Sequence, residues 1–65
     1  MVVVNGVRLP HRPGLTVADL VGEWSPSSKG IAVAVDRTVV PRSEWVSTLL
    51  DPGAVVEIVT AAAGG

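Results

Sequence analysis

One segment limits the possible folds more than any other: the stretch TVADLVGEW at residues 16–24. Val17, Leu20, Val21 and Trp24 recur at i, i+3, i+4 and i+7, which places them on one face of a helix. The other apolar residues come mostly in short runs rich in valine. A chain of 65 residues has room for a single domain. Because the helix and the strands must bury their apolar faces against each other, the sequence predicts one sheet packed on one helix.

Clear signals mark both ends of this helix. Thr16 is a good N-cap, and Asp19 stands three residues later in a weak form of the capping box. Ser25-Pro26 ends the helix, because the residue before proline avoids the helical region. Trp24 shares the apolar stripe, so we expect its side chain in the core. The loop that follows contains Ser27 and Ser28, which have no base near them in the pattern and do not predict a nucleophile.

Five runs are expected to be strands, and turn residues separate them. Asn5-Gly6 is the favoured pair for a two-residue type I′ turn and predicts a hairpin. Asp36-Arg37 predicts a second tight turn. In IAVAV, large and small residues alternate, as in a central strand with one face on a helix and the other closely approached. The expected strands cover residues 2–4, 7–9, 31–35, 38–40 and 55–59.

The segment between the fourth and fifth strands is expected to hold a short helical turn. Ser43 could cap it, and Glu44 and Trp45 lie within it. We expect Trp45 in the core, with its indole N–H bonded to an acceptor. His11 is expected to be a solvated loop histidine. A right-handed crossover would lay a strand parallel to the first. The fold class is therefore α+β, with a mixed sheet of four to five strands on one α-helix.

Composition and charge argue against several classes of function. The chain has no cysteine and one histidine, so a disulfide framework and a conventional zinc site are not expected. Five basic residues are scattered along a chain of net charge −1, unlike the basic stripe of a nucleic-acid binder. No apolar run approaches the roughly 20 residues of a membrane span, and the N-terminus lacks the features of a signal peptide. A cytoplasmic protein is the default expectation.

The chain ends on AAAGG, without a sizeable side chain. We expect residues 1–60 to form the domain and residues 61–65 to form a flexible tail. No paired carboxylates, nucleophile with a base, or phosphate-binding glycine loop is evident elsewhere in the sequence. The sequence therefore does not predict an autonomous enzyme.

Several of these motifs, in this order, resemble one family. The stretches are NG near the start, LTVADLV, AVAV before a turn, VVPRSEW, and VEIVTAAAGG at the end. They resemble the ThiS family of ubiquitin-like sulfur carriers of thiamine thiazole synthesis, which have the β-grasp fold. Two positions depart from the pattern of the family. Asp36 replaces a common asparagine, and Ala54 replaces a common acidic residue.

The resemblance implies a function for the tail. A ThiF-like adenylating enzyme would use ATP to activate the carboxylate of Gly65, which follows Gly64. A sulfur donor enzyme would convert it to a thiocarboxylate, and a ThiG-like thiazole synthase would receive the sulfur. The chain itself would bind no cofactor, metal, nucleic acid or membrane. Two alternatives remain open: the small-subunit sulfur carrier of molybdopterin synthase, and a non-conjugating ubiquitin-like adapter.

Partner enzymes are expected to grip the body as well as the tail. If Val2 and Val4 face the helix, their neighbours face away from it and form a low apolar patch, which usually marks a partner site. Asp36 and Arg37 are expected to act as turn residues, and Arg42 is either solvated or paired with an acid of a partner. The predicted partner-binding residues are Val3, Ala32, Ala34, Val55, Val59, Ala61, Ala62 and Ala63.

Overall fold

The computed structural model describes residues 1–24 and 30–60. Its elements follow the predicted order: β1 (Val2–Val4), β2 (Val7–Leu9), α1 (Val17–Trp24), β3 (Ile31–Val35), β4 (Thr38–Val40), the 3₁₀ helix η1 (Arg42–Ser47) and β5 (Val55–Thr60). The predicted tail at residues 61–65 lies outside the described residues, as does the loop at 25–29.

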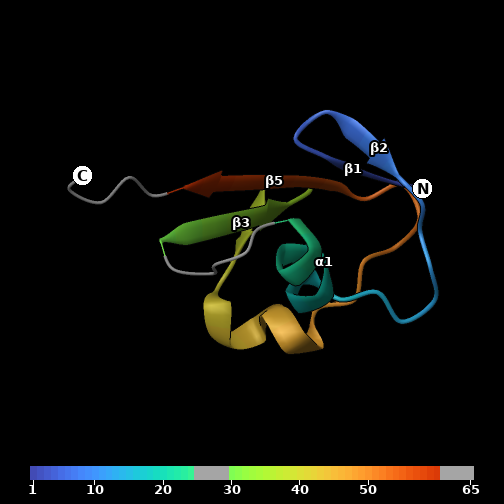
Figure 1. Ribbon diagram of the computed structural model, residues 1–65. Coiled ribbons are helices and arrows are strands. Elements are labelled where there is room, and N and C mark those ends of the chain that lie inside the picture. Colours follow the sequence, from blue (N-terminus) through green and yellow to red (C-terminus); the bar gives the residue numbers. More distant parts are fainter. Residues whose placement is uncertain (25–29, 61–65) are drawn as a thin grey trace.

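The five strands form one mixed sheet in the order β2-β1-β5-β3-β4 (Figure 1). The last strand, β5, lies in the middle. It pairs parallel with β1, with Val3 opposite Val55, and antiparallel with β3, with Val33 opposite Ile58. The predicted strand parallel to the first is thus β5. β5 is therefore the central strand of the sheet, with two strands on each side of it.

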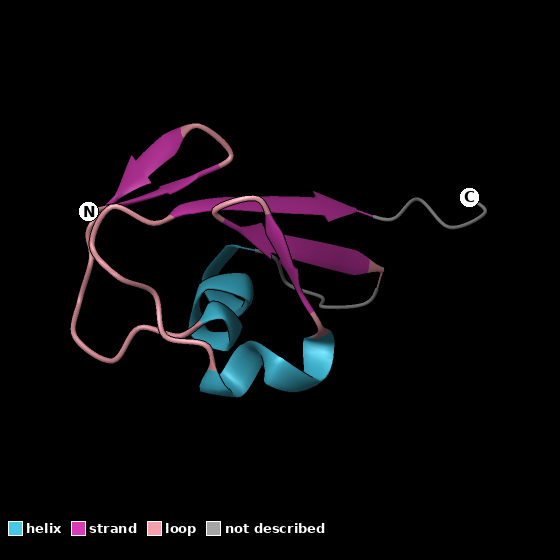
Figure 2. Cartoon of the chain, turned by 180° about the vertical axis from the view of Figure 1, so that it is seen from behind, coloured by secondary structure: helices cyan, strands magenta, loops and turns pink. Residues whose placement is uncertain are grey.

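The core lies between the sheet and its helices. Figure 2 shows both helices on the same side of the sheet. Val2, Val4, Val56 and Val33 point to that side and are at most 1% exposed. They meet the helix through Val17, Leu20 and Val21, while Ile31 and Val35 pack around this cluster. Aliphatic side chains therefore make up most of the core. Burying each valine or leucine side chain stabilises the fold by about 1.5–3 kcal/mol.

The start of α1 has the predicted capping box. The Asp19 backbone N–H donates to Thr16 Oγ1 at 3.1 Å, and the Thr16 N–H donates to Asp19 Oδ2 at 3.2 Å. The helix ends at Trp24, before Ser25-Pro26, as expected. The prediction for the Trp24 side chain is wrong, because it is 38% exposed and lies outside the core cluster. Its place in the last turn leaves it beyond the buried stripe, which ends at Val21.

Both tight turns have the backbone that their residues predict. Asn5 and Gly6 have φ values of 50° and 83°, and Asp36 and Arg37 have 48° and 71°. Positive φ at both central residues defines the type I′ turn, whose twist suits a hairpin. Val4 pairs with Val7 and Val35 pairs with Thr38 across these turns. The two hairpins flank β5 on opposite sides.

The segment η1 places the second tryptophan. Trp45 is 5% exposed, and its Nε1–H donates to the Val40 carbonyl oxygen at 3.0 Å, so both predictions for it are confirmed. The prediction that Ser43 caps this turn is wrong. Pro41 occupies the N-cap position without a side-chain hydrogen bond, and Ser43 lies inside the helix. Pro41 has its φ near −60° and lacks an N–H, which suits the start of a helical turn.

The long connection after β2 is tied to the segment before β5. His11 is half-buried, and its Nε2 lies 2.8 Å from the Leu50 carbonyl oxygen, so the prediction of a solvated histidine is wrong. The Leu50 N–H donates in turn to the Leu15 carbonyl oxygen at 2.8 Å. These bonds join two loops 39 positions apart in the sequence, a contact that local pattern does not reveal.

Candidate functional site

The face of the sheet away from the helix is the candidate site. Along β5, Val56 and Ile58 are buried on the inner side, whereas Val55, Glu57 and Val59 are exposed on the outer side. This alternation follows from the two-residue period of a strand. Val55 and Val59 are 48% and 55% exposed, so large apolar side chains stand open to solvent here.

The strand register brings the predicted partner-binding residues of the body onto this one face. Val3 pairs with Val55, and Ala32 pairs with Val59. Ala34 pairs with Glu57 on one side and with Val39 on the other. The role of these residues in binding stays a prediction. The other predicted site residues, Ala61, Ala62, Ala63, Gly64 and Gly65, lie outside the described residues.

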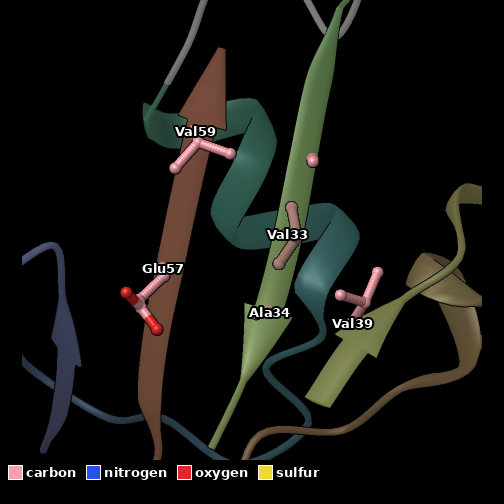
Figure 3. A pocket seen from close by; sticks show the side chains of 6 residues that line it. Val33, Ala34, Val39, Glu57 and Val59 are labelled. Atoms are coloured by element: carbon pink, nitrogen blue, oxygen red, sulfur yellow. The ribbon is translucent and has the colours of Figure 1, made fainter. Parts of the chain in front are cut away.

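A shallow groove crosses this face over β3 (Figure 3). It has a volume of about 160 Å³ and is lined by Ala32, Val33, Ala34, Val39, Glu57 and Val59. Alanines form its floor because their side chains are shorter than the valines on the flanking strands. Figure 3 shows Val39 on β4 on one side of β3, and Glu57 and Val59 on β5 on the other.

The sequence analysis did not select three of the groove residues: Val33, whose side chain is buried in the core, and the exposed Val39 and Glu57. Val39 is 70% exposed, the consequence of alternation along β4. Glu57 stands between two exposed valines on β5. Both could have been found by extending the alternation already used for Val55 and Val59, since residues two apart on a strand share a face.

A second hollow on the same face has a more polar lining than the groove. It measures about 490 Å³ and is lined by Asp36, Arg37, Val55 and Glu57. Glu57 therefore borders both hollows. Among residues 1–24 and 30–60, no hydrogen bond or ion pair within 4.0 Å joins Glu57 to another side chain, including Arg37. In Figure 3 its carboxylate points to the side of β5 away from β3.

Two side chains fix β5 in place by bonding to its backbone. Asn5 Nδ2 donates to the Ile58 carbonyl oxygen at 2.9 Å, and the Ile58 N–H donates to Asn5 Oδ1 at 2.8 Å. On the opposite side, the Val55 N–H donates to Asp36 Oδ1 at 2.9 Å. Asn5 thus continues the pairing of β5 beyond the end of β1. The sequence predicted both residues only as turn formers.

Two charged groups in the described part of the chain have contacts of their own. Arg12 pairs with Glu23 on the surface, and the hydrogen bond to that carboxylate raises the pKa of Arg12. Arg42 lies over the Trp45 ring, 5.3 Å from its centroid. Within the described part of the chain, no three His, Cys, Asp or Glu side chains gather where they could hold a metal ion. In that same part, neither helix has the length and apolar character to cross a membrane.

A mixed sheet that wraps one helix, with its last strand in the middle, defines a β-grasp protein of the ubiquitin-like kind. The fold is similar to a solved structure, the thiamine biosynthesis protein ThiS from Geobacter metallireducens. That structure matches with a TM-score of 0.80 and 22% identity, over 98% of this chain and 97% of the other. No curated protein matches the chain at a significant level.

The family comparison goes further than the fold. The model of the ThiS family matches residues 2–65, which is nearly the whole chain. The chain therefore belongs to the ThiS family, the small sulfur carriers of thiamine biosynthesis. This confirms the resemblance drawn from the sequence motifs.

Proposed function

We propose that the chain carries sulfur as a thiocarboxylate on the C-terminal carboxyl group of Gly65 and donates it to thiazole formation. The observation that carries this proposal is the extent of the family match, which runs through Gly64 and Gly65 to residue 65. The described body supports it by offering an apolar face for partners.

The chemistry needs two steps on one carboxyl group, the first at the α-phosphorus of ATP and the second at the carbonyl carbon. An α-carboxyl group has a pKa of roughly 3.5, so it is ionised at neutral pH and can attack the α-phosphate of ATP. Pyrophosphate leaves, and the carboxyl group becomes an acyl-adenylate. A hydrosulfide ion released by the sulfur donor then attacks the carbonyl carbon, AMP leaves with the former carboxyl oxygen, and the S–H proton is lost to water. The product is a thiocarboxylate, so the chain acts as a substrate of its partners.

The residues of the tail suit entry into a partner's active site. From Thr60 to Gly65 an extended chain reaches at most roughly 20 Å. Glycine has no Cβ to meet the walls of a narrow channel, and it tolerates backbone angles that other residues avoid. A β-branched residue at position 64 would reduce both the clearance from the channel walls and the range of allowed backbone angles. Gly64 is therefore proposed as the residue that lets the Gly65 carboxyl group approach ATP.

The body would provide the rest of the binding energy. Ordering a free backbone costs about 1–2 kcal/mol per residue, so binding through the tail alone is inefficient. The outer-face residues Val3, Ala32, Ala34, Val55 and Val59 are proposed to contact the ThiF-like adenylating enzyme and the ThiG-like thiazole synthase. Residues Ala61–Ala63, within the tail, are proposed to contact the walls of the partner's channel. Hydrogen bonds on both sides of β5 hold the strand that leads to the tail.

The proposal is tested by intact mass spectrometry after incubation with ATP, the adenylating enzyme and a sulfur donor. The expected result is the replacement of one oxygen by sulfur, located at Gly65 by fragmentation. A chain amidated at Gly65 is the matched control and should stay unmodified while folding normally. An unchanged mass for the native chain, with an active adenylating enzyme, would contradict the proposal.

The molybdopterin alternative differs from the proposed function in the enzyme that accepts the sulfur. The thiocarboxylate form is offered to a thiazole synthase and to the large subunit of molybdopterin synthase, and sulfur transfer is followed by the return of the mass of the carboxylate. Transfer to the thiazole synthase alone is expected. Transfer only to the molybdopterin enzyme would assign the chain to the other branch.

A further inference from the structure

The groove on the outer face combines an apolar floor with a single carboxylate. Ala32 and Ala34 form the floor, and Val39 and Val59 form parts of the walls. Glu57 stands beside Val59 along β5 (Figure 3). The groove is open to solvent and about 160 Å³ in volume, which is room for one long side chain.

A partner that covers this face must satisfy Glu57. Within the described residues its carboxylate accepts no hydrogen bond, so in the free protein it depends on water. Burying an ionised carboxylate without a partner is costly, and buried charges are paired for this reason. The covering protein therefore has to bring a positive charge to the position beside Val59.

We infer that this groove receives an arginine side chain of the partner protein that takes up the tail, an inference that rests on the proposed function. The alkyl part of the arginine lies along Ala32 and Ala34, and its guanidinium group binds the Glu57 carboxylate. Long cationic side chains commonly bury their stems on apolar surface in this way. Arginine fits better than lysine, since its guanidinium is weakly hydrated and its planar fork can donate two hydrogen bonds to a carboxylate.

Among the described residues, Arg37 and Arg8 leave this position available. Arg37 borders the second hollow on the other side of Glu57, and the two side chains form no ion pair. Arg8, opposite Val3 on β2, lies on the far side of β1 from β5. The arginine stem therefore lies over the alanine floor, and its guanidinium group extends across β5 to the carboxylate, which Figure 3 shows on the side away from β3.

The decisive variant is Glu57→Gln, which keeps the size of the side chain and removes its charge. Binding to the adenylating enzyme and to the thiazole synthase is measured by calorimetry at several salt concentrations. We expect Glu57→Gln to weaken binding about 10-fold or more with at least one of them, and to reduce the dependence on salt. Affinity equal to that of the native chain for both enzymes would overturn the inference.

Glu44→Gln is the matched control, because it removes the same charge from an exposed carboxylate on η1, on the helical side of the sheet. Its affinity should equal that of the native chain. A loss of the same size in Glu44→Gln would show that net charge, and not the groove, controls binding, which also overturns the inference. Thermal unfolding checks that both variants keep the fold.

The variant Ala34→Leu, compared with Glu57→Gln, shows whether the partner places an arginine or an apolar side chain in the groove. A leucine would fill the floor of the groove and should weaken binding to the same partner as Glu57→Gln does. If Ala34→Leu weakens binding while Glu57→Gln does not, the groove takes an apolar side chain and the arginine is excluded. Thiocarboxylate formation by the native chain is measured in parallel. If the native chain forms no thiocarboxylate, the proposed function is refuted. If it forms the thiocarboxylate and Glu57→Gln binds both enzymes with the affinity of the native chain, only the inference of an arginine in the groove is refuted.

Discussion

Val56 and Val59 lie three residues apart on the same strand and have opposite surroundings. Val56 has no exposed surface and contacts the core beneath the sheet, whereas Val59 is 55% exposed beside the alanine floor of the groove. Residue type alone does not distinguish them. The difference shows that the side chains on the inner face of β5 stabilise the fold, whereas the apolar side chains on its outer face do not pack in the core. The proposed function gives that surface a use.

The largest effect on stability is expected for Val56→Ala. It removes two buried methyl groups and leaves a cavity, so the free energy of unfolding should fall by about 2–3 kcal/mol. Urea unfolding followed by tryptophan fluorescence measures the change. An effect smaller than that of the outer-face variant Val59→Ala would break the comparison between the two faces.

The next largest effect is expected for Asn5→Gly. Glycine keeps the positive φ of the turn, so the variant isolates the loss of the two hydrogen bonds to Ile58. Leaving these half-buried groups unpaired should cost about 1–3 kcal/mol. Asp36→Gly is the matched control at the other turn. It loses one exposed bond to Val55, so we expect it to cost less than Asn5→Gly in the same urea titration.

A moderate effect is expected for Thr16→Ala, which tests the helix that covers the inner face. Loss of the bond from the Asp19 N–H to Thr16 Oγ1 should lower the free energy of unfolding by about 1 kcal/mol. Thr16→Ser keeps the hydroxyl group and should retain most of the stability. Equal losses in the two variants would show that the threonine methyl group, and not the cap, matters.

The smallest effect on stability, and a clear effect on binding, is expected for Val59→Ala. Its side chain is largely open to solvent, so the free energy of unfolding should change by less than about 0.5 kcal/mol. Affinity for the adenylating enzyme should nevertheless fall, as measured by calorimetry. Unchanged affinity would remove Val59 from the proposed contact surface and sharpen the boundary of the site.

The sequence predicted the parts of the fold that depend on neighbouring residues. Asn5-Gly6 defines its turn through two positive φ angles, and Thr16 with Asp19 caps the helix within four positions. The alternation at residues 31–35 correctly gave the two faces of β3. These features follow from backbone sterics and local hydrogen bonds, which act over short stretches.

The features that the sequence did not predict depend on contacts between distant residues. Asn5 bonds to Ile58 across 53 positions, and His11 to Leu50 across 39, so neither partner could be chosen before the topology was known. Trp24 follows the periodicity of the helix, but periodicity does not say where the sheet stops covering it. Glu57 became a candidate only when the register placed it opposite Ala34, in the floor of the groove.

The parallel pairing of β1 and β5 has a mechanical consequence. The chain enters β1 at Val2 and leaves β5 at Thr60, at opposite ends of the paired strands (Figure 1). A pull on the residue after Thr60, against a body held elsewhere, loads two hydrogen bonds in shear: the one from the Val3 N–H to the Ala54 carbonyl oxygen and the one from the Asn5 N–H to the Val56 carbonyl oxygen. Such bonds share the force and break together, not one after another as in a zipper. An enzyme can therefore draw on this end of the chain without peeling the domain apart.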